Sequence, residues 1–265
     1  MPVTINTNPA ASTAARALEV ANSNLTTSLK KLSTGNRIVN AYEDAAGEAV
    51  QQRLKNEDAQ YNALKTNIQN GISFLEVQAG VLDSAMGAMI RFGELVAMAD
   101  DSTKGTNDIA LYQHEATELI QLFTDLDNQT FNGVALFGGS ATVTFSLSAG
   151  TTAMNLGDED LAGDIGNSDR SDVAGETQAN VNLDIDAIAA LKAQVGAKMA
   201  ALNYHYDNAV VTQSNIQAAR GRIVDTDIAS ESGVYAKQQV LAQAAAAMLS
   251  QANSIGTQSA MQLLL

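Results

Sequence analysis

The stretch that decides the fold is LKTNIQNGISFLEVQAGVLDSAMGAM, residues 64–89. Its apolar side chains recur at steps of three and four, the spacing of one face of an α-helix. The only prolines of the chain are Pro2 and Pro9, so a helix can continue in both directions. We predict a helix that runs to about Asp100 and is roughly 85 Å long. Its apolar positions are Leu64, Ile68, Ile72, Leu75, Ala79, Leu82, Met86 and Met89.

The residues before this helix predict another one. Leu18, Ala21, Leu25 and Leu32 keep heptad-like spacing, with Leu29 beside them. The run Ser33-Thr34-Gly35-Asn36 predicts the end of that helix, with Gly35 at the left-handed cap position. Asn40, followed three residues later by Glu43, resembles a capping box and predicts the start of the next helix.

Two further helical stretches follow. A third helix is predicted from about Asn107 to Leu126, and the stretch from Ile185 is predicted to continue almost unbroken to Leu249. Helices of this length cannot all bury their apolar stripes in a compact sphere, so they must pair with each other or with neighbouring molecules. The fold class is therefore mainly α.

The middle of the chain has a different pattern. Asn132-Gly133 and Gly138-Gly139 are dipeptides typical of hairpin turns, and residues 142–147 alternate like a short strand. Residues 148–180 are rich in Gly, Ser and Asp, and we interpret them as an exposed acidic excursion that joins two helical halves. The two halves also echo each other, since the run 34–40 is mirrored by 219–225; chance similarity between two helix–loop junctions remains an equal explanation.

Composition excludes several classes of function. The net charge of −14 argues against nucleic-acid or anionic-membrane partners. The absence of Cys removes disulfides, thiolate metal sites and cysteine nucleophiles. Residues 1–8 show no secretory signal peptide, and the longest apolar run, 241–249, is too short to span a bilayer.

Candidate catalytic and metal sites are weak. His114 and His205, the only histidines, have no second ligand three or four residues away, so we predict no zinc site. The acids Asp158, Glu159, Asp160 and Asp164 lack the alternating loop and distal Glu of a calcium site, which favours a solvated loop. Gly138-Gly139 is interpreted as a turn and not as a phosphate loop. We expect no catalytic residue, no metal and no cofactor.

Several motifs, in order, resemble bacterial flagellins. They are the opening run 5–8, the run Leu29 to Val50 (LKKLSTGNRIVNAYEDAAGEAV), Asn70-Gly71-Ile72-Ser73, the run 128–133 (NQTFNG), the run 219–231 and the run 248–253 (MLSQAN). The resemblance covers roughly residues 1–140 and 183–265. Tyr42-Glu43-Asp44 departs from the Lys-Asp-Asp usual in the family. Because the central excursion is short, the chain resembles a minimal flagellin without large outer domains.

The resemblance implies an architecture. In flagellins the two terminal helices pair as an antiparallel coiled coil in the filament core, and the central part faces outward. For this chain it implies three parts: terminal inner-core helices (1–42 with 226–265), a helical bundle with a β-hairpin (43–140 with 181–225) and a short acidic outer loop (141–180). The expected function is a structural, non-enzymatic subunit that polymerises into the extracellular flagellar filament for motility.

Site residues and partners follow from the same resemblance. The expected filament-core packing positions are Leu18, Leu25, Leu29, Leu32, Leu241, Met248 and Leu249, and intramolecular packing is their alternative. Arg91, Glu94 and Leu95 match part of a family segment that contacts either the vertebrate innate flagellin receptor or a neighbouring subunit. The expected partners are further copies of the chain, an export chaperone, the filament cap and the hook-junction proteins, with type III export as an unfolded chain.

Two alternatives stay open. The first is the hook–filament junction protein, which shares the plan of terminal helices; the run Asp44-Ala45-Ala46-Gly47 favours flagellin, because junction proteins typically place a proline there. The second is a hydrolase inserted in the central excursion. About forty residues without Cys or His make that second alternative hard to sustain.

Overall fold

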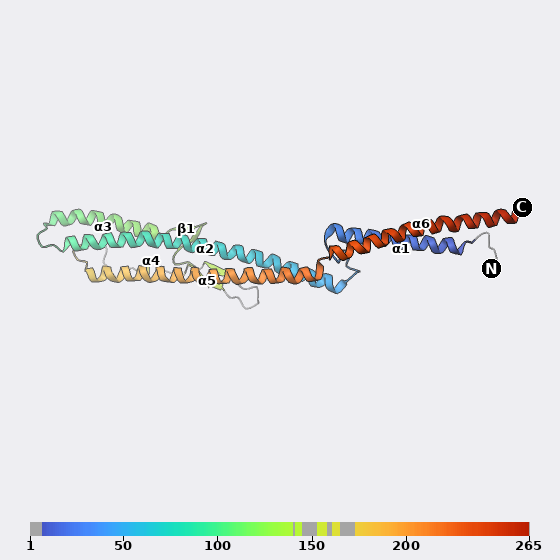
Figure 1. The fold of residues 1–265 in the computed structure, drawn as a ribbon. Helices are drawn as coiled ribbons and strands as arrows, with labels where there is room; N and C mark the ends of the chain where they lie inside the picture. Colours follow the sequence, from blue (N-terminus) through green and yellow to red (C-terminus); the bar gives the residue numbers. More distant parts are fainter. Residues whose placement is uncertain (1–6, 140, 145–152, 158–160, 165–172, 265) are drawn as a thin grey trace. The chain divides into compact units, whose positions relative to one another are not determined.

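Long helices dominate the computed structural model, which describes residues 7–139, 141–144, 153–157, 161–164 and 173–264 (Figure 1). The mainly α prediction is therefore confirmed. The long helices are α1 (Pro9–Thr34), α2 (Ala45–Ala99), α3 (Thr106–Asp127), α5 (Gln178–Val224) and α6 (Ile228–Leu264). The short elements are β1 (Thr130–Phe131), β2 (Val134–Ala135), β3 (Thr142–Thr144), β4 (Ala153–Asn155) and α4 (Leu161–Asp164).

The chain forms two compact units. The terminal unit comprises Met1–Glu57 and Asn215–Leu265, and the middle unit comprises Asp58–Ser214. The division falls inside α2 and α5 and not in a loop, so each of these helices contributes to both units.

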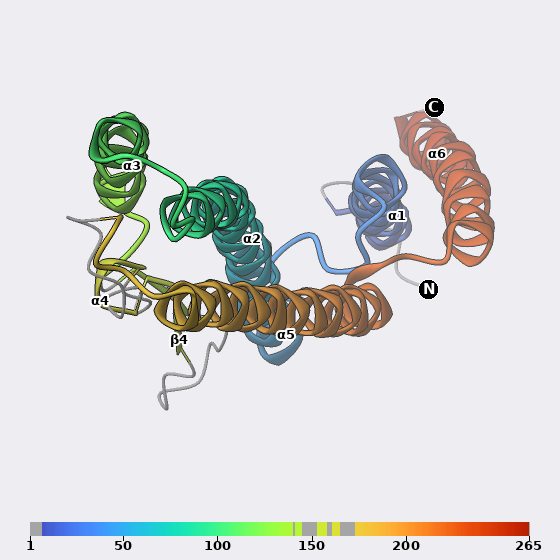
Figure 2. The same cartoon turned by 90° about the vertical axis from the view of Figure 1, so that its left-hand side faces the viewer.

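In the terminal unit, α1 and α6 lie side by side (Figure 2) and run in opposite directions (Figure 1). At one end, the Asn8 side chain donates a hydrogen bond to the Ala252 carbonyl at 2.9 Å. At the other end, the Thr226 amide donates to the Gly35 carbonyl at 2.8 Å. The start of α1 therefore lies beside the later part of α6, and the antiparallel pairing of the chain ends is confirmed.

Both ends of α1 are capped locally. The Asn8 side chain accepts a hydrogen bond from the Ala11 amide, and Pro9 occupies the first turn, where it removes no needed donor. Gly35 ends the helix in the left-handed conformation, with φ 71°, and its amide donates to the Lys31 carbonyl. The predicted stop at residues 33–36 is confirmed.

The start of α2 differs from the prediction. The helix begins at Ala45, and the Asp44 carboxylate accepts the Gly47 amide at 2.8 Å, so Asp44 is the capping residue. The Asn40 side chain instead donates to Glu43 across a turn that precedes the helix. The capping-box prediction at Asn40 was wrong because these two side chains bond to each other and not to the backbone of a first helical turn.

The C-terminal stretch is not one helix. It breaks at Asp225–Asp227, and Asp227 caps α6 by accepting the amides of Ala229 and Ser230. Residues that follow α1 also stabilise the break. Asp225 forms an antiparallel bridge with Asn36, and the Arg37 guanidinium donates twice to the Ile223 carbonyl. The two mirrored motifs thus lie beside each other in the terminal unit. The predicted helical stretch from Ile185 to Leu249 is therefore helical apart from this one interruption at residues 225–227.

The middle unit holds the hydrophobic core. Side chains of α2, α3 and α5 supply most of the core, and side chains of the hairpin region pack against one part of it. The largest side chains with almost no exposure are Ile68, Leu75, Leu82, Met89, Phe92, Leu95, Leu136, Leu161, Ile188, Leu191 and Leu202. The helical periodicity of residues 64–89 therefore marks the face of α2 that is buried in this unit.

The predicted hairpin at residues 131–134 is confirmed. β1 pairs with β2 antiparallel, and the connecting Asn132 and Gly133 have φ of 52° and 79°, as a type I′ turn requires. The strand predicted over 142–147 is described as β3, which pairs with β4; residues 145–147 lie outside the described residues. Of the acidic excursion, residues 148–152, 158–160 and 165–172 also lie outside them.

Among the described residues, no helix is both long enough and apolar enough to cross a bilayer.

Candidate assembly surface

The terminal unit has almost no hydrophobic core of its own. Among its described residues, the buried apolar side chains are Ala21, Ile38, Val224 and Ala245. Two of these are alanines at the seam of α1 and α6, and Ser28 is also buried on α1. Small side chains let two helices approach closely but remove little apolar area from water. The α1–α6 pair therefore gains little stability from its own burial.

A stripe of larger apolar side chains on α6 is left uncovered. Val234, Leu241, Met248 and Ile255 are spaced seven residues apart and are 41%, 45%, 66% and 54% exposed. Residues seven apart lie on the same face of a helix, as in a coiled-coil seam. These four residues, hereafter the α6 stripe, form an apolar seam that is only partly covered by the described residues of this chain.

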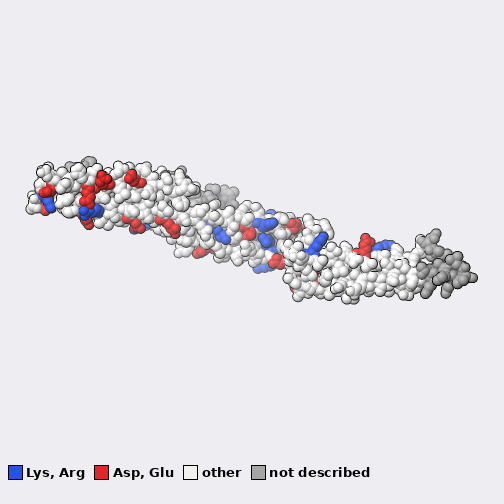
Figure 3. Space-filling model, turned by 90° about the horizontal axis from the view of Figure 1, so that it is seen from above, with Lys and Arg blue, Asp and Glu red and all other residues white. Residues whose placement is uncertain are grey.

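The α6 stripe borders a groove between α1 and α6. The groove measures about 810 Å³, and its α6 wall includes Leu241 and Met248. Its α1 wall is made mostly of small side chains, with Val20 as the largest apolar one. On the face shown in Figure 3 few charged side chains cover this pair. Glu231 and Lys237 are the only charged residues of α6.

The predicted filament-core residues divide into two groups in this unit. Leu18, Leu25, Leu32 and Leu249 are half-buried, whereas Leu29, Leu241 and Met248 are exposed. Their role in a filament stays a prediction. Sequence reasoning missed Val234 and Ile255, although the seven-residue step from Leu241 and Met248 marks both positions.

Arg91 lies at the centre of an ion-pair cluster of the middle unit. Its Nε donates to Glu115 Oε1 at 2.6 Å and its Nη2 to Glu115 Oε2 at 3.1 Å, a bidentate pair that joins α2 to α3. Its Nη1 donates to Glu94 Oε2 at 2.7 Å. The hydrogen bonds to Glu115 and Glu94 raise the pKa of Arg91, and the bond from Arg91 lowers the pKa of Glu115.

Leu95 does not share the exposure of Arg91 and Glu94. It is fully buried in the core of the middle unit, because it lies on the same face of α2 as Phe92. The expectation that all three residues present a contact surface must be corrected for Leu95. The exposed part of that segment is Arg91 and Glu94, and its contact with any partner stays a prediction.

Among the described residues, the remaining candidate positions do not come together as a catalytic or metal-binding site. His114 is exposed on α3. Among the described residues, no three His, Cys, Asp or Glu side chains come together as metal ligands. The acidic run 158–160 lies outside these residues, so the expectation of a solvated loop there is untested.

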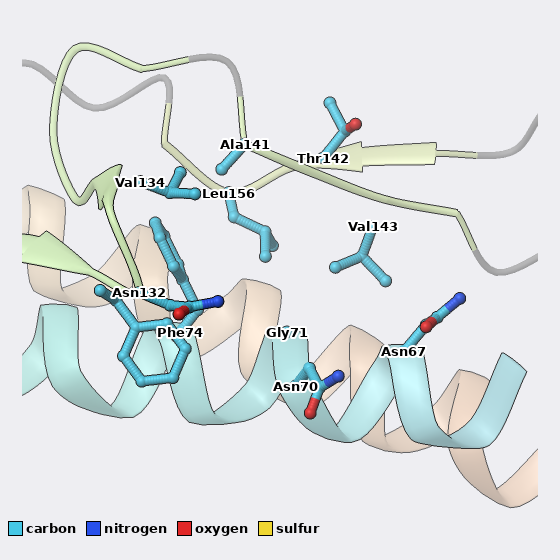
Figure 4. Close-up of a pocket in the computed structure, with 11 residues that line it drawn as sticks. Asn67, Asn70, Gly71, Phe74, Asn132, Val134, Ala141, Thr142, Val143 and Leu156 are labelled. Atoms are coloured by element: carbon cyan, nitrogen blue, oxygen red, sulfur yellow. The ribbon is translucent and has the colours of Figure 1, made fainter. Parts of the chain in front are cut away.

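A hollow of about 480 Å³ lies between α2 and the hairpin region of the middle unit (Figure 4). Asn67, Asn70 and Phe74 of α2 line one side, and Val143 and Leu156 are among the residues that line the other. Gly71 lets β3 approach, since a Cβ there would meet Val143 Cγ2 at 2.6 Å. Phe131 packs edge-on against Phe74, with ring centroids 6.1 Å apart.

Comparison with protein families gives two matches. The bacterial flagellin N-terminal helical region matches residues 5–142, and the bacterial flagellin C-terminal helical region matches residues 179–264. The two matches leave out the segment 143–178 and a few residues at each end. Together they contain α1, α2, α3, α5, α6 and the hairpin.

Comparison with individual proteins agrees with the two family matches. A flagellar filament 33 kDa core protein of Treponema phagedenis is 32% identical, over 98% of this chain and 99% of its own length. The flagellin FlaB2 of Treponema pallidum is also 32% identical with the same coverage, and a flagellin of Bacillus subtilis is 28% identical over 98% of this chain and 99% of its own length. These relatives are named as flagellins or filament core proteins, and none of the three carries a junction-protein name.

Proposed function

The chain belongs to the bacterial flagellin family, and we propose that it assembles by burying the α6 stripe against further copies of itself. It is a structural subunit of the flagellar filament and not an enzyme. The observation that carries the proposal is the near absence of large buried apolar side chains in the described part of the terminal unit, beside an apolar seam on α6.

The energetics favour burial between subunits. Full burial of an apolar side chain of this size stabilises by about 1.5–3 kcal/mol. The four residues of the α6 stripe are already partly covered, so each gains a fraction of that amount on assembly. The gain repeats in every subunit and offsets the entropy cost of ordering α1 and α6.

The groove between α1 and α6 suits the same role. Its small α1 side chains leave room for a side chain of a neighbouring helix, while Leu241 and Met248 supply apolar contact. Contacts between different patches of identical subunits do not close on themselves, so they propagate a helical polymer. We propose that Leu18, Leu25, Leu32 and Leu249 support the pair from within and that Leu29, Leu241 and Met248 contact neighbours.

The regional division is part of this proposal. Residues 1–42 with 226–265 would form the inner part of the filament, and residues 43–140 with 181–225 the helical bundle around it. Residues 141–180 would face outward. The support is the contrast between the apolar, nearly uncharged α6 and the well-filled core of the middle unit.

Further partners are proposed on the family resemblance alone. They are an export chaperone, the filament cap and the hook-junction proteins, with passage of the unfolded chain through the type III channel to the cell exterior. The support for a chaperone is that α6 carries an exposed apolar seam, the kind of surface that aggregates when it is left uncovered.

Contact of Arg91 and Glu94 with the vertebrate innate flagellin receptor, or with a neighbouring subunit, is a separate proposal. Arg91 already has two carboxylate partners within the chain, so a docking protein would have to displace one or accept the cluster as a whole. Receptor-reporter cells treated with purified monomer test the receptor contact. Activation at ordinary doses supports it, and silence contradicts it.

The assembly proposal is tested with the double variant Leu241→Ser, Met248→Ser in the full chain. Seeded or ammonium sulfate-induced polymerisation is followed by sedimentation and electron microscopy. We expect the variant to remain monomeric under conditions in which the unaltered chain forms filaments. The reason is that serine at these two positions of the seam gains little free energy when it is buried.

The matched control is Leu111→Ser, which removes a leucine that is 68% exposed on α3 of the middle unit. It should polymerise normally. Filaments of the double variant at the yield of the unaltered chain would contradict the role of the α6 stripe.

A further inference from the structure

Met248 differs from the other methionines in its contact with solvent. It is 66% exposed, which makes it the most exposed methionine among the described side chains. An oxidant dissolved in water must reach the thioether sulfur before it can react, so burial protects a methionine. The other described methionines are buried in the core of the middle unit or packed against it, and they are Met86, Met89, Met98, Met154 and Met199.

Met248 also lies on the surface that the assembly proposal assigns to neighbouring subunits. It stands in the α6 stripe, seven residues from Leu241 and seven from Ile255, and it lines the groove between α1 and α6. The most exposed methionine sulfur of the described chain is therefore part of an apolar seam. A chemical change at this sulfur alters the seam directly.

A hydroperoxide makes such a change. The sulfur attacks one peroxide oxygen, an S–O bond forms, the O–O bond breaks, and with hydrogen peroxide the second oxygen leaves as water. Sulfur loses two electrons and the peroxide gains them. The product is methionine sulfoxide, a polar side chain whose oxygen accepts hydrogen bonds. Burial of that oxygen without a donor is costly.

The seam around Met248 offers few donors for a sulfoxide oxygen. Ala244 and Ala245, one turn earlier on α6, line the same groove and have no polar side-chain atom. The Thr13 hydroxyl, on the α1 wall, already donates to the Pro9 carbonyl. In the monomer water can satisfy the sulfoxide oxygen, but a neighbouring helix that covers the seam removes this water. Oxidation therefore opposes assembly more than it opposes folding.

We propose that Met248 is a site of reversible oxidation by hydroperoxides and that its sulfoxide keeps the monomer out of the polymer. The inference rests on the proposed assembly role of the α6 stripe. Methionine sulfoxide reductases, one for each epimer of the sulfoxide, reverse the modification. In that reaction two thiols of the reductant form a disulfide, and the sulfoxide oxygen leaves as water.

The first experiment measures the rate of oxidation at each methionine. The full-length monomer is treated with hydrogen peroxide, the reaction is stopped at intervals, and peptide mass spectrometry gives the oxidised fraction at each position. We expect Met248 to react at least about fivefold faster than Met98 or Met199, because those two pack against the core. Equal rates at the three positions would overturn the proposal.

The second experiment asks where the oxidised chains go. Monomer in which part of Met248 is oxidised is seeded with fragments of untreated filaments and then sedimented. The share of Met248 sulfoxide should be at least about fivefold lower in the sediment than in the supernatant, since its oxygen lacks a donor in the covered seam. Sulfoxide at Met154 of β4, in the middle unit, is the internal control and should divide evenly. Equal shares for Met248 would show that groove side chains such as Arg16 accept the oxygen, and would overturn the proposal.

A variant and a rescue show that Met248 is the residue responsible. Met248→Leu has no sulfur at this position, so its polymer yield should be the same with and without peroxide treatment. An equal loss of yield on peroxide treatment in this variant and in the unaltered chain would place the effect at another residue. Treatment of the oxidised, unaltered chain with both reductases and dithiothreitol should restore its yield, and no recovery would contradict reversibility.

Peroxide treatment of intact filaments separates this inference from the assembly proposal. Met248 should react more slowly in filaments than in the monomer, because neighbouring subunits cover the α6 stripe. Equal rates in the two states, with normal filaments of the Leu241→Ser, Met248→Ser variant, would contradict the assembly proposal and the inference with it. If that variant stays monomeric while chains with Met248 sulfoxide polymerise, only the present inference fails.

Discussion

At the scale of the residue, Arg91 shows how a few atoms join two helices. Its guanidinium donates to both oxygens of Glu115 across the α2–α3 contact and to Glu94 on its own helix. The bidentate geometry fixes the relative rotation of the two side chains, which a lysine could not do. The cluster lies at the surface, so its role is to position α3 more than to supply stability.

Glu115 gives a pH prediction at this scale. The hydrogen bond from Arg91 lowers its pKa in the folded chain below the unfolded value of about 4.3. The stabilising contribution is therefore present above the unfolded pKa and is lost as the pH falls through the lowered folded pKa. Carboxyl-carbon NMR should show Glu115 titrating at a lower pH than an unfolded-state glutamate.

The variant Arg91→Met provides the control for that titration. It keeps much of the apolar stem of the side chain and removes the donors, so the pKa of Glu115 should rise toward its ordinary range. An unchanged titration midpoint for Glu115 in this variant would show that Arg91 does not cause the shift.

At the scale of the element, α2 passes the hairpin region at Gly71. A Cβ at this position would meet Val143 of β3 at 2.6 Å and Leu202 of α5 at 3.3 Å. Because Gly71 has no side chain, both β3 and α5 can approach α2 closely at this position. Gly80, nine residues further along the same helix, has open space around it. The two glycines have the same helical conformation but opposite surroundings.

This contrast gives opposite predictions for the same substitution. Gly71→Ala should lower the stability of the middle unit by about 1–3 kcal/mol, because Val143 must move to avoid the added methyl group. Gly80→Ala should raise it by about 0.5–1 kcal/mol, because alanine favours the helix and no contact is lost. Urea unfolding followed by circular dichroism measures both, and destabilisation by both substitutions would contradict this account of Gly71.

At the scale of the whole molecule, the two units differ in how they are stabilised. The buried core described by the structure lies within residues 64–209, all of them in the middle unit. The terminal unit exposes a stripe of apolar side chains and buries mostly small ones. In such a chain the middle unit can stay folded by itself, while the apolar side chains of the terminal unit are covered only when neighbouring subunits bind.

Truncation tests this division. Removal of residues 1–34 or of residues 228–265 should leave the middle unit folded, since its core is untouched, and should abolish polymerisation. Near-unchanged proteolytic protection of residues 64–209, together with loss of sedimenting polymer, is the expected result. A truncated chain that still builds filaments would contradict the assembly role of the paired ends.

The sequence by itself determined what depends on neighbours along the chain. The periodicity of residues 64–89, the glycine cap at Gly35 and the Asn132-Gly133 turn were all predicted, because helices, caps and tight turns are set by local backbone preferences and spacing. The motifs that resemble flagellins are also read directly from the sequence, in their order along the chain. The two family matches agree with that resemblance.

Only the tertiary structure decided which face of each helix is covered. Periodicity marks an apolar stripe but does not say what covers it, so Leu95 turned out to be buried and Leu241 exposed. The end of α5 is held partly by Asn36 and Arg37, which are distant in sequence. Such contacts join residues far apart in the chain, and no local pattern encodes them.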